Sequence, residues 1–416
     1  MTVVMSGQPP EDERMDSDRP VEPLAGEPAQ ARRWLSVGMS TEDDSRSAGR
    51  AAAGQAIAGR AAALLIVFCT PHHDPAAVLA GILEVGAGTP LIGCCTAAVI
   101  TAEGPAKHGV VVTALGGPGF SVATAGATGA ATRQRAAGAQ VAASAIRVQE
   151  RPHQVLLLLT DGRSQDQEEI LSGAYDVVGA SMPLVGGAAC PDLTTPDTFQ
   201  FLDDQVLVDA VVGATIASDS ALGIGLQHGW HKVGTPMIVT SSANGQVRTL
   251  DDQPALEAFL RRLDAPAEAY SDPVAFDQFT RTRPIGVRRR SGEEVRNVSS
   301  VEHFREGWLR SSGEIPEGGL ISAMEADEES VLAAAVTACR SAVEALDGAA
   351  PLGLIAFDCV SRSDLLGEAG VKLEVERLVT EADGTPLAGL YTWGEIARTK
   401  GINGFHNHTL VILAVS

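Results

Sequence analysis

The sequence has few aromatic residues, since Phe, Trp and Tyr together make up 4% of its 416 residues. Alanine and glycine are abundant instead, and 45% of all residues are hydrophobic. A chain of this length and apolar content can bury a substantial core. We therefore expect two to three domains of ordinary size, with a core built from small, closely packed side chains.

Positive charge is also scarce. The chain has 31 Lys and Arg residues against 52 Asp and Glu, which gives a formal net charge of −21. Nucleic acids and anionic membrane surfaces attract proteins through basic patches. We therefore expect neither nucleic acid nor membrane as a general partner.

Cysteine spacing typical of metal sites is missing. None of the six cysteines forms a CxxC motif, and several lie in apolar runs, where reduced buried thiols are the usual state. These residues are Cys69, Cys94, Cys95, Cys190, Cys339 and Cys359. We expect no metal and no cofactor.

Long uninterrupted hydrophobic runs are missing too. Residues 1–33 are rich in Pro, Glu, Asp and Ser and contain no apolar run of signal-peptide length, which predicts a disordered acidic tail. Val85–Ala102 has no charged residue, but three glycines and Pro90 interrupt it, so it predicts a buried strand with its flanks. We expect a soluble, cytoplasmic protein.

An internal repeat is the strongest architectural signal that is present. Pro386–Ile396 and Pro90–Ile100 share Pro, Leu, Gly, Thr and Ile at equal spacing, and Pro183–Gly187 repeats the opening. Each copy follows a β-rich run and a helix-like stretch, and each precedes a further apolar strand. The β-rich runs are Leu64–Phe68, Val155–Leu159 and Leu354–Phe357; the later strands are Gly109–Leu115, Asp209–Ile216 and Thr409–Val415.

The spacing of the copies indicates a fourth, degenerate unit. The gap between Pro183 and Pro386 is about twice the gap between Pro90 and Pro183, and Pro284-Ile285-Gly286 lies near its midpoint. We expect an α/β fold of mixed α+β type, in which β-α-β-β-β-α units form mixed sheets with flanking helices. Four units could stack as helix, sheet, sheet and helix. We expect an N-terminal domain over 34–264 and a C-terminal domain over 265–416.

Local signals mark several element ends. Asp74-Pro75 begins a helix as N-cap and first-turn proline, and Ser164 caps a helix to Val178 with Gln167 at the capping-box position. A hairpin is expected across Asp203-Asp204, and a turn at Asn244-Gly245. Further helices are expected over 44–60, 132–148, 254–263 and 328–346.

The last repeat carries the best candidate ligand site. Thr392, Gly394 and Glu395 follow its strand, and His406 and Asn407 precede the final strand, so their polar groups could converge on one cleft. A carboxylate suits a cationic group, an amide both donates and accepts, and a glycine permits close backbone approach. The alternative is a structural turn in which Glu395 accepts backbone N–H bonds.

Two other kinds of site remain open. His406 and His408 alternate onto one face, as a metal pair would, but no third ligand is evident nearby. Cys94 or Cys95 with a histidine would make a cysteine-dependent hydrolase, although buried strand thiols are commoner. A scaffold that binds only another protein is a third alternative.

Together these motifs resemble the FIST proteins, which have an N-terminal and a C-terminal FIST domain. The resemblance spans roughly residues 34–416. It implies a non-enzymatic sensory module for small ligands, such as amino acids, in bacterial signal transduction. No attached signalling domain is evident, so its output would need a separate signalling protein. The usual first motif has Gly-Glu where this chain has Ala98-Val99. The resemblance is carried by Pro90–Cys94 with Thr96, Gln167–Glu169, Pro183–Gly187, Leu222–Trp230, Leu387–Ile396 and Phe405–Asn407.

Overall fold

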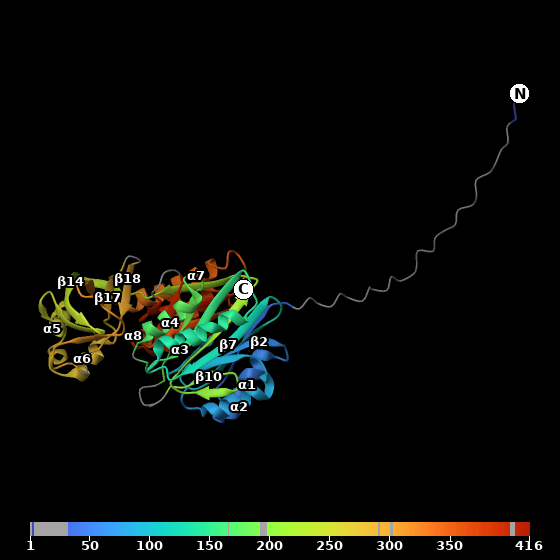
Figure 1. The fold of residues 1–416 in the computed structure, drawn as a ribbon, viewed down its shortest axis with the longest axis horizontal. Coiled ribbons are helices and arrows are strands. Elements are labelled where there is room, and N and C mark those ends of the chain that lie inside the picture. The colour runs from blue at the N-terminus through green and yellow to red at the C-terminus, as the bar shows by residue number, and fades with distance from the viewer. Residues whose placement is uncertain are drawn as a thin grey trace. The chain divides into compact units, whose positions relative to one another are not determined.

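The computed structural model describes residues 2–3, 32–164, 166–191, 198–289, 292–299, 303–399 and 404–416. Within the tail expected before residue 34, residues 4–31 lie outside the described residues. Arg33–Ser416 forms one compact unit (Figure 1).

The first sheet has six strands in the order β1-β6-β2-β3-β10-β11. The helices α1 (Ser45–Ile57) and α2 (Pro75–Gly86) belong to the same segment of the chain. The strands are β1 (Trp34–Ser40), β6 (Val110–Gly116), β2 (Ala62–Cys69), β3 (Leu91–Cys95), β10 (Gln200–Leu202) and β11 (Gln205–Leu207).

The second sheet has the order β13-β25-β22-β23-β9-β8-β12-β7, with β4, β5 and β24 attached beside β23. Its main strands are β13 (Leu222–Gln227), β25 (Leu410–Val415), β22 (Gly353–Cys359), β23 (Leu387–Arg398), β9 (Leu184–Ala189), β8 (His153–Asp161), β12 (Ala210–Ser218) and β7 (Phe120–Thr128). The attached strands are β4 (Val99–Thr101), β5 (Gly104–Ala106) and β24 (Phe405–His406). The helices of this part are α3 (Gln134–Ala142), α4 (Gln167–Val178), α7 (Glu328–Glu344) and α8 (Val360–Glu381).

The chain between β13 and α7 forms a third, antiparallel sheet in the order β18-β17-β21-β14-β15-β20-β19, with β16 beside β15. The helices α5 (Ala255–Arg262) and α6 (Pro273–Thr280) belong to this segment. Its strands are β14 (His231–Ala243), β15 (Gln246–Leu250), β16 (Gln253–Pro254), β17 (Ile285–Arg289), β18 (Gly292–Arg296), β19 (Val298–Ser299), β20 (Leu309–Ser311) and β21 (Leu320–Glu325).

Three of the expected repeat units have the same topology. In each, the first strand pairs in parallel with the Pro-Leu strand on one side and antiparallel with the last strand on the other. The three trios are β6-β2-β3, β12-β8-β9 and β25-β22-β23. The internal repeat is therefore present in the strand order as well as in the sequence.

The prediction of a fourth repeat unit is wrong. The strand at Pro284-Ile285-Gly286, β17, pairs antiparallel with both β18 and β21, and no parallel pairing of it occurs in the described part of the chain. A match of Pro, an aliphatic residue and Gly is too short to specify a strand order, because many turns before strands have that composition.

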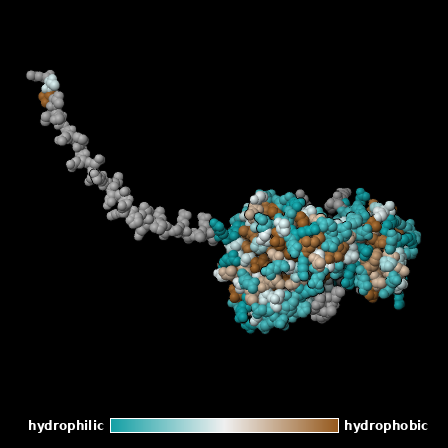
Figure 2. All heavy atoms as spheres, turned by 180° about the vertical axis from the view of Figure 1, so that it is seen from behind, coloured by the Kyte–Doolittle hydropathy of each residue, from teal (hydrophilic) through white to brown (hydrophobic). Residues whose placement is uncertain are grey.

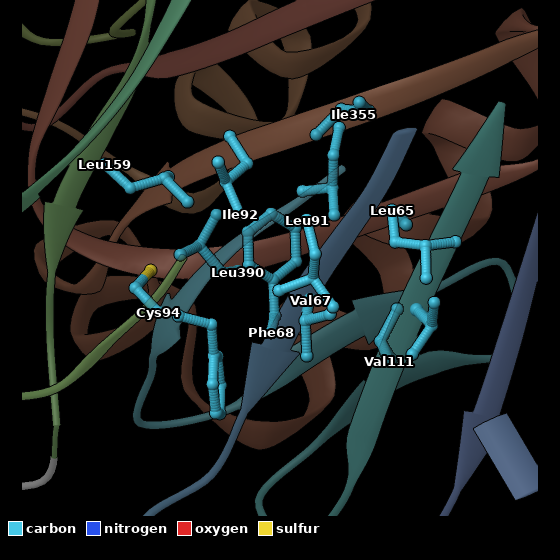
Figure 3. Close-up of a cluster of buried hydrophobic side chains, with 14 of the residues drawn as sticks. Leu65, Val67, Phe68, Leu91, Ile92, Cys94, Val111, Leu159, Ile355 and Leu390 are labelled. Atoms are coloured by element: carbon cyan, nitrogen blue, oxygen red, sulfur yellow. The ribbon is translucent and has the colours of Figure 1, made fainter. Parts of the chain in front are cut away.

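The layers follow the expected order of helix, sheet, sheet and helix. Side chains of the first and second sheets meet in one core, where the rings of Phe68 and Phe357 lie edge to face with centroids 6.5 Å apart. Figure 3 shows Phe68 from β2 among Leu159, Ile355 and Leu390 of the opposing sheet. Helices α1 and α2 pack on the outer face of the first sheet, and α3, α4, α7 and α8 on that of the second (Figure 1).

Most local signals are confirmed. Asp74 accepts the Ala77 N–H at 2.7 Å as the N-cap of α2, and the hairpin at Asp203 and the turn at Asn244 both form, with positive φ at these residues. The prediction that Ser164 caps α4 is wrong. Asp166 is the N-cap of α4 and accepts the Glu169 N–H at 3.1 Å, whereas Ser164 Oγ is buried without a hydrogen-bond partner in the described structure.

Large exposed hydrophobic residues are dispersed over the described surface. Within Arg33–Ser416 they are Val85, Ile146, Val177, Val208, Ile238, Tyr270 and Val274, and all but Val208 lie in separate helices or strands. Figure 2 shows hydrophobic residues interspersed with hydrophilic ones on the face it presents. None of the helices in the described part of the chain is both long enough and apolar enough to cross a membrane.

Candidate functional site

Two repeat units meet in the middle of the second sheet, where β9 and β23 are antiparallel neighbours. The pairing places Cys359, Thr392, Ala189 and Asp161 in one row across four strands, from β22 through β23 and β9 to β8. Cys359 and Asp161 are the last residues of their strands. In sheets of this kind, ligands bind beyond the carboxyl ends of parallel strands, and here two such ends coincide.

An irregularity in β23 shapes this junction. The pairing with β9 breaks between Thr392 and Glu395, so Trp393 lies in a bulged segment. Gly162, just after β8, packs so closely that an added Cβ would lie 2.1 Å from Ala189 O and 2.8 Å from Trp393 Cε3. Glycine at this position lets the backbone of one unit lie directly against the indole of the other.

A cavity of about 390 Å³ lies over the junction. Its lining comes from all three repeat units and from the chain between β13 and α7, called the antiparallel segment. The lining residues are Ala97, Gly162, Cys190, Pro191, Asp277, Arg281, Asn297, Cys359, Val360, Ser361, Asp364, Trp393 and Asn407. A second hollow of about 670 Å³ shares Ala97, Val360 and Asp364 with the first, so the two are neighbours and together are called the cleft.

Opposite charges line the cavity where α6 faces α8. Arg281 follows α6 and lies 3.4 Å from Asp277 Oδ2 and 3.9 Å from Asp364 Oδ2. Burial raises the pKa of the Asp364 carboxyl. One cation and two carboxylates at a cavity wall could hold a ligand that itself carries both signs of charge.

Asn407 is the sequence-predicted residue that lines the cavity. It is 2% exposed, its Oδ1 accepts from the Ser312 hydroxyl, and its Nδ2 donates to Trp393 O at 3.2 Å. The amide therefore connects the bulge in β23 to the antiparallel segment. Gly394 lies beside it, and an added Cβ there would be 2.2 Å from the Phe405 ring.

Glu395 and Thr392 are fully buried and are not among the described residues that line the cavity. Thr392 Oγ1 donates to Glu395 Oε1 at 2.6 Å, and the Thr409 N–H donates to Glu395 Oε2 at 3.1 Å. Burial raises the pKa of Glu395 to about 8, so the carboxyl is largely neutral at pH 7. The structure brings this pair together behind the cavity wall, next to Cys359.

His408 is buried and His406 is half-buried, and neither is among the described residues that line the cavity. His406 Nε2 lies 2.9 Å from Ala397 O, to which its N–H donates, and burial lowers the pKa of His406 to about 4. The His408 ring packs against Trp230 with centroids 4.9 Å apart, and burial lowers the pKa of His408 to about 3. Within the described residues there is no group of three or more His, Cys, Asp or Glu placed to hold a metal ion.

Cys94 and Cys95, the nucleophiles of the alternative hydrolase, are fully buried in one core cluster, and Figure 3 shows Cys94 there. Burial raises the pKa of Cys94 well above its usual range and that of Cys95 to about 12. Neither is among the described residues lining the cleft. This environment favours structural thiols.

Cys359 is one of several cavity residues that the sequence motifs missed, together with Asp277, Arg281 and Asp364. The strand registers give the signal that could have found Cys359, because Thr70, Asp161 and Cys359 occupy the same place in the three units. Each stands five residues after the residue that pairs with the Leu of its Pro-Leu strand. A polar or reactive residue at a parallel strand's carboxyl end is where chemistry is expected.

Comparison with known proteins agrees with this architecture. Residues 63–253 match the FIST N domain, and residues 255–398 match the FIST C domain. The chain belongs to the FIST family. FIST domains are associated with small-ligand sensing and signal transduction. Curated relatives include the uncharacterized protein Mb0898c of Mycobacterium bovis and the uncharacterized protein MT0897 of Mycobacterium tuberculosis. Each is 26% identical over 391 residues, which cover 90% of this chain and 97% of theirs.

Proposed function

We propose that this FIST protein is a cytoplasmic small-ligand sensor whose ligand binds in the cavity beyond β8/β9 and β22/β23. The cavity itself carries the proposal, because it lies at the carboxyl ends of two parallel strand pairs and is lined by polar groups from distant segments. Binding there would connect the repeat units to the antiparallel segment. That connection gives a ligand a means of changing the protein's conformation or stability.

The charges favour a zwitterionic ligand such as an amino acid. Arg281 would hold a carboxylate, and Asp277 and Asp364 an ammonium group. Asn407 would contact the ligand through its amide. Thr392, Gly394, Glu395 and His406 would support the wall from behind, since they pack or hydrogen-bond beside it.

The output would pass to a separate signalling protein. The third sheet and its helices supply Asp277, Arg281 and Asn297 to the cavity, while the repeats supply the opposite wall. A ligand that draws the two together would change the surface that the partner binds.

Thermal-shift screening with the amino acids tests the ligand class, because a ligand selective for the folded state raises the melting temperature. A hit should be confirmed by titration calorimetry. Arg281→Ala should weaken its affinity about tenfold or more, as expected for a lost charge-assisted bond.

Arg377→Ala is the matched control. It removes an arginine paired with the exposed Glu329, away from the cleft, and should leave affinity unchanged. Equal affinity for the wild type and Arg281→Ala would exclude the cavity as the site of that ligand.

A further inference from the structure

The second hollow of the cleft is lined by the first and the last repeat units. Its volume of about 670 Å³ is within the range of pockets that hold small molecules. Part of the lining comes from the first unit, and the rest from α8 and β23 of the last unit. The lining residues are Ala97, Ala98, Pro105, Lys107, Val360, Ser363, Asp364, Gly367, Glu368, Val371, Lys372 and Tyr391.

Solvent exposure divides this lining into a rim and a floor. The rim consists of the exposed lining residues, and all of them except Gly367 are charged: Lys107, Asp364, Gly367, Glu368 and Lys372. The floor consists of the buried and half-buried lining residues, and all of them except Ser363 have an apolar or aromatic side chain: Ala97, Ala98, Pro105, Val360, Ser363, Val371 and Tyr391.

The floor is continuous with the hydrophobic core of the last unit. Ala98, Val371 and Tyr391 belong to the core cluster that includes residues of α7, β22 and β25. Burial raises the pKa of the Tyr391 hydroxyl well above its usual range, so none of the floor side chains is charged at neutral pH. An apolar group gains free energy by leaving water for such a surface, whereas a charged group loses its hydration there.

Helix α8 departs from helical geometry where it borders the hollow. Gly367 has φ of 62° and ψ of −176°, a backbone conformation that favours glycine. The helical segments on both sides of this break contribute to the lining. They supply Val360, Ser363 and Asp364 before the break and Glu368, Val371 and Lys372 after it.

The second hollow adjoins the cavity to which the proposed ligand binds. Ala97, Val360 and Asp364 line both. Asp364 Oδ2 lies 3.9 Å from Arg281, and these two side chains are assigned to the ammonium and carboxylate groups of the ligand. In an amino acid the side chain branches from the carbon that carries both charged groups. A zwitterion held at Asp364 therefore has its side chain close to the floor residues Ala97 and Val360.

We propose that the ligand is an amino acid with a large apolar side chain, aromatic or branched aliphatic, and that this side chain occupies the second hollow. The charged groups bind Arg281 and Asp364, and the side chain packs on the floor that includes Val371 and Tyr391. A small side chain leaves the floor uncovered, and a charged one loses hydration on it. This inference rests on the proposed function, because it takes the zwitterion to bind at Arg281 and Asp364.

Titration calorimetry with two amino acids tests this specificity. L-Phenylalanine and L-alanine have the same charged groups, so the ratio of their affinities reports the side chain alone. We expect L-phenylalanine to bind at least about tenfold more tightly, because its ring leaves water for an apolar surface. Equal affinities would overturn the inference and leave the zwitterion site intact. No binding by any amino acid would overturn the proposed function, and this inference with it.

Ser363→Phe fills the second hollow from α8. Ser363 lines this hollow, is not among the described residues that line the first cavity, and donates to Val360 O at 2.7 Å. The bulky side chain should weaken L-phenylalanine binding at least about fivefold and leave L-alanine binding unchanged. Unchanged L-phenylalanine affinity, or equal weakening of both ligands, would overturn the inference.

Thr337→Phe is the matched control. Exposed Thr337 lies on α7, donates to Ala333 O at 2.9 Å and is not among the described residues that line the cleft. The variant makes the same kind of change as Ser363→Phe, a helix hydroxyl replaced by a ring. Both affinities should stay at their wild-type values.

Photolabelling locates the side chain without any variant. 4-Azido-L-phenylalanine is irradiated with the folded wild-type protein, and the labelled peptides are mapped by mass spectrometry. We expect labels within residues 97–107 and 360–372, which include most of the lining, and excess L-phenylalanine should prevent them. Labels that L-phenylalanine prevents but that lie outside both segments and away from Tyr391 would overturn the inference.

Discussion

The second and last repeat units share a strand order but divide the site between them unequally. The unit of β8, α4 and β9 contributes backbone and small residues, Gly162 and Cys190, to the cavity. The unit of β22, α8 and β23 contributes Cys359, Ser361 and Trp393. The last unit thus contributes more polar side chains to the cavity lining than the second unit does.

The helices of the two units differ in how they are held. Helix α4 begins after a loop and is capped by Asp166, whereas α8 begins directly after β22 without a side-chain cap bond. A buried ion network holds α8 instead. Arg362 is fully buried and bonds to Asp358 Oδ1 at 2.8 Å, to Glu374 and to His228 O at 2.9 Å. Buried ion pairs therefore hold α8 of the last unit, whereas α4 of the second unit begins at a side-chain cap.

Loss of Arg362 should cause the largest loss of stability. Arg362→Ala would leave Asp358 and Glu374 buried without their cation, and removal of one partner from a buried ion pair costs about 3–5 kcal/mol. Urea denaturation should report a loss of that size. Arg377→Ala, which breaks the exposed pair with Glu329, should leave the midpoint nearly unchanged. Similar small losses in both variants would show that the network does not hold α8.

The next largest effect should be on the pH dependence of stability, to which Glu395 of the last unit contributes, whereas the second unit has no counterpart. Glu395 has a folded pKa of about 8, above its unfolded value, so the folded state binds more protons between those values and stability falls as pH rises toward 8. The second unit has Gly187 opposite Glu395 and no such group there. The free energy of unfolding of Glu395→Gln should therefore increase relative to that of the wild type as pH rises from 5 to 9, by on the order of a few kcal/mol. A constant difference across that range would contradict the buried neutral carboxyl.

The glycine after each Pro-Leu pair should show a graded effect. A Cβ at Gly186 would lie 1.8 Å from Leu158 O, and one at Gly389 would lie 2.6 Å from Ala356 O. Gly186 also has φ of 144°. Both alanine variants should lose about 1–3 kcal/mol through overpacking, with Gly186→Ala the less stable. Gly54→Ala, in a helix with open space around the site, should not lose stability. The reverse order for the two strand variants would contradict the close approach.

The cap of α4 should give the smallest effect. Asp166→Ala should cost about 1 kcal/mol, because it removes the carboxylate that accepts the hydrogen bond from the Glu169 N–H. Ser164→Ala should cost less, since Ser164 Oγ is buried without a hydrogen-bond partner in the described structure. A larger loss for Ser164→Ala in thermal unfolding would restore serine as the cap.

The strands of the repeat units could be predicted because residues that recur in the sequence make the same contacts in each unit. The Pro-Leu-x-Gly pattern specifies a buried strand whose glycine lies against a neighbouring carbonyl, and three copies of it marked the three units whose strand order the structure shows. The short match at Pro284 lacks those contacts, and it led to the wrong prediction of a fourth repeat unit. The site was harder to predict. Asn407 lies in it, but Cys359 enters through the pairing of β22 with β23, which links residues far apart in the sequence.

The last strand has a consequence for how the protein is made. β25 lies inside the second sheet, where it pairs antiparallel with both β13 and β22. Both neighbours emerge from the ribosome first, so each keeps an unpaired edge until residues 410–415 follow. Exposed edges of buried apolar strands invite pairing between chains. The cavity can therefore form only after synthesis passes Val415, and a chain stopped shortly before it would be prone to aggregate rather than to bind ligand.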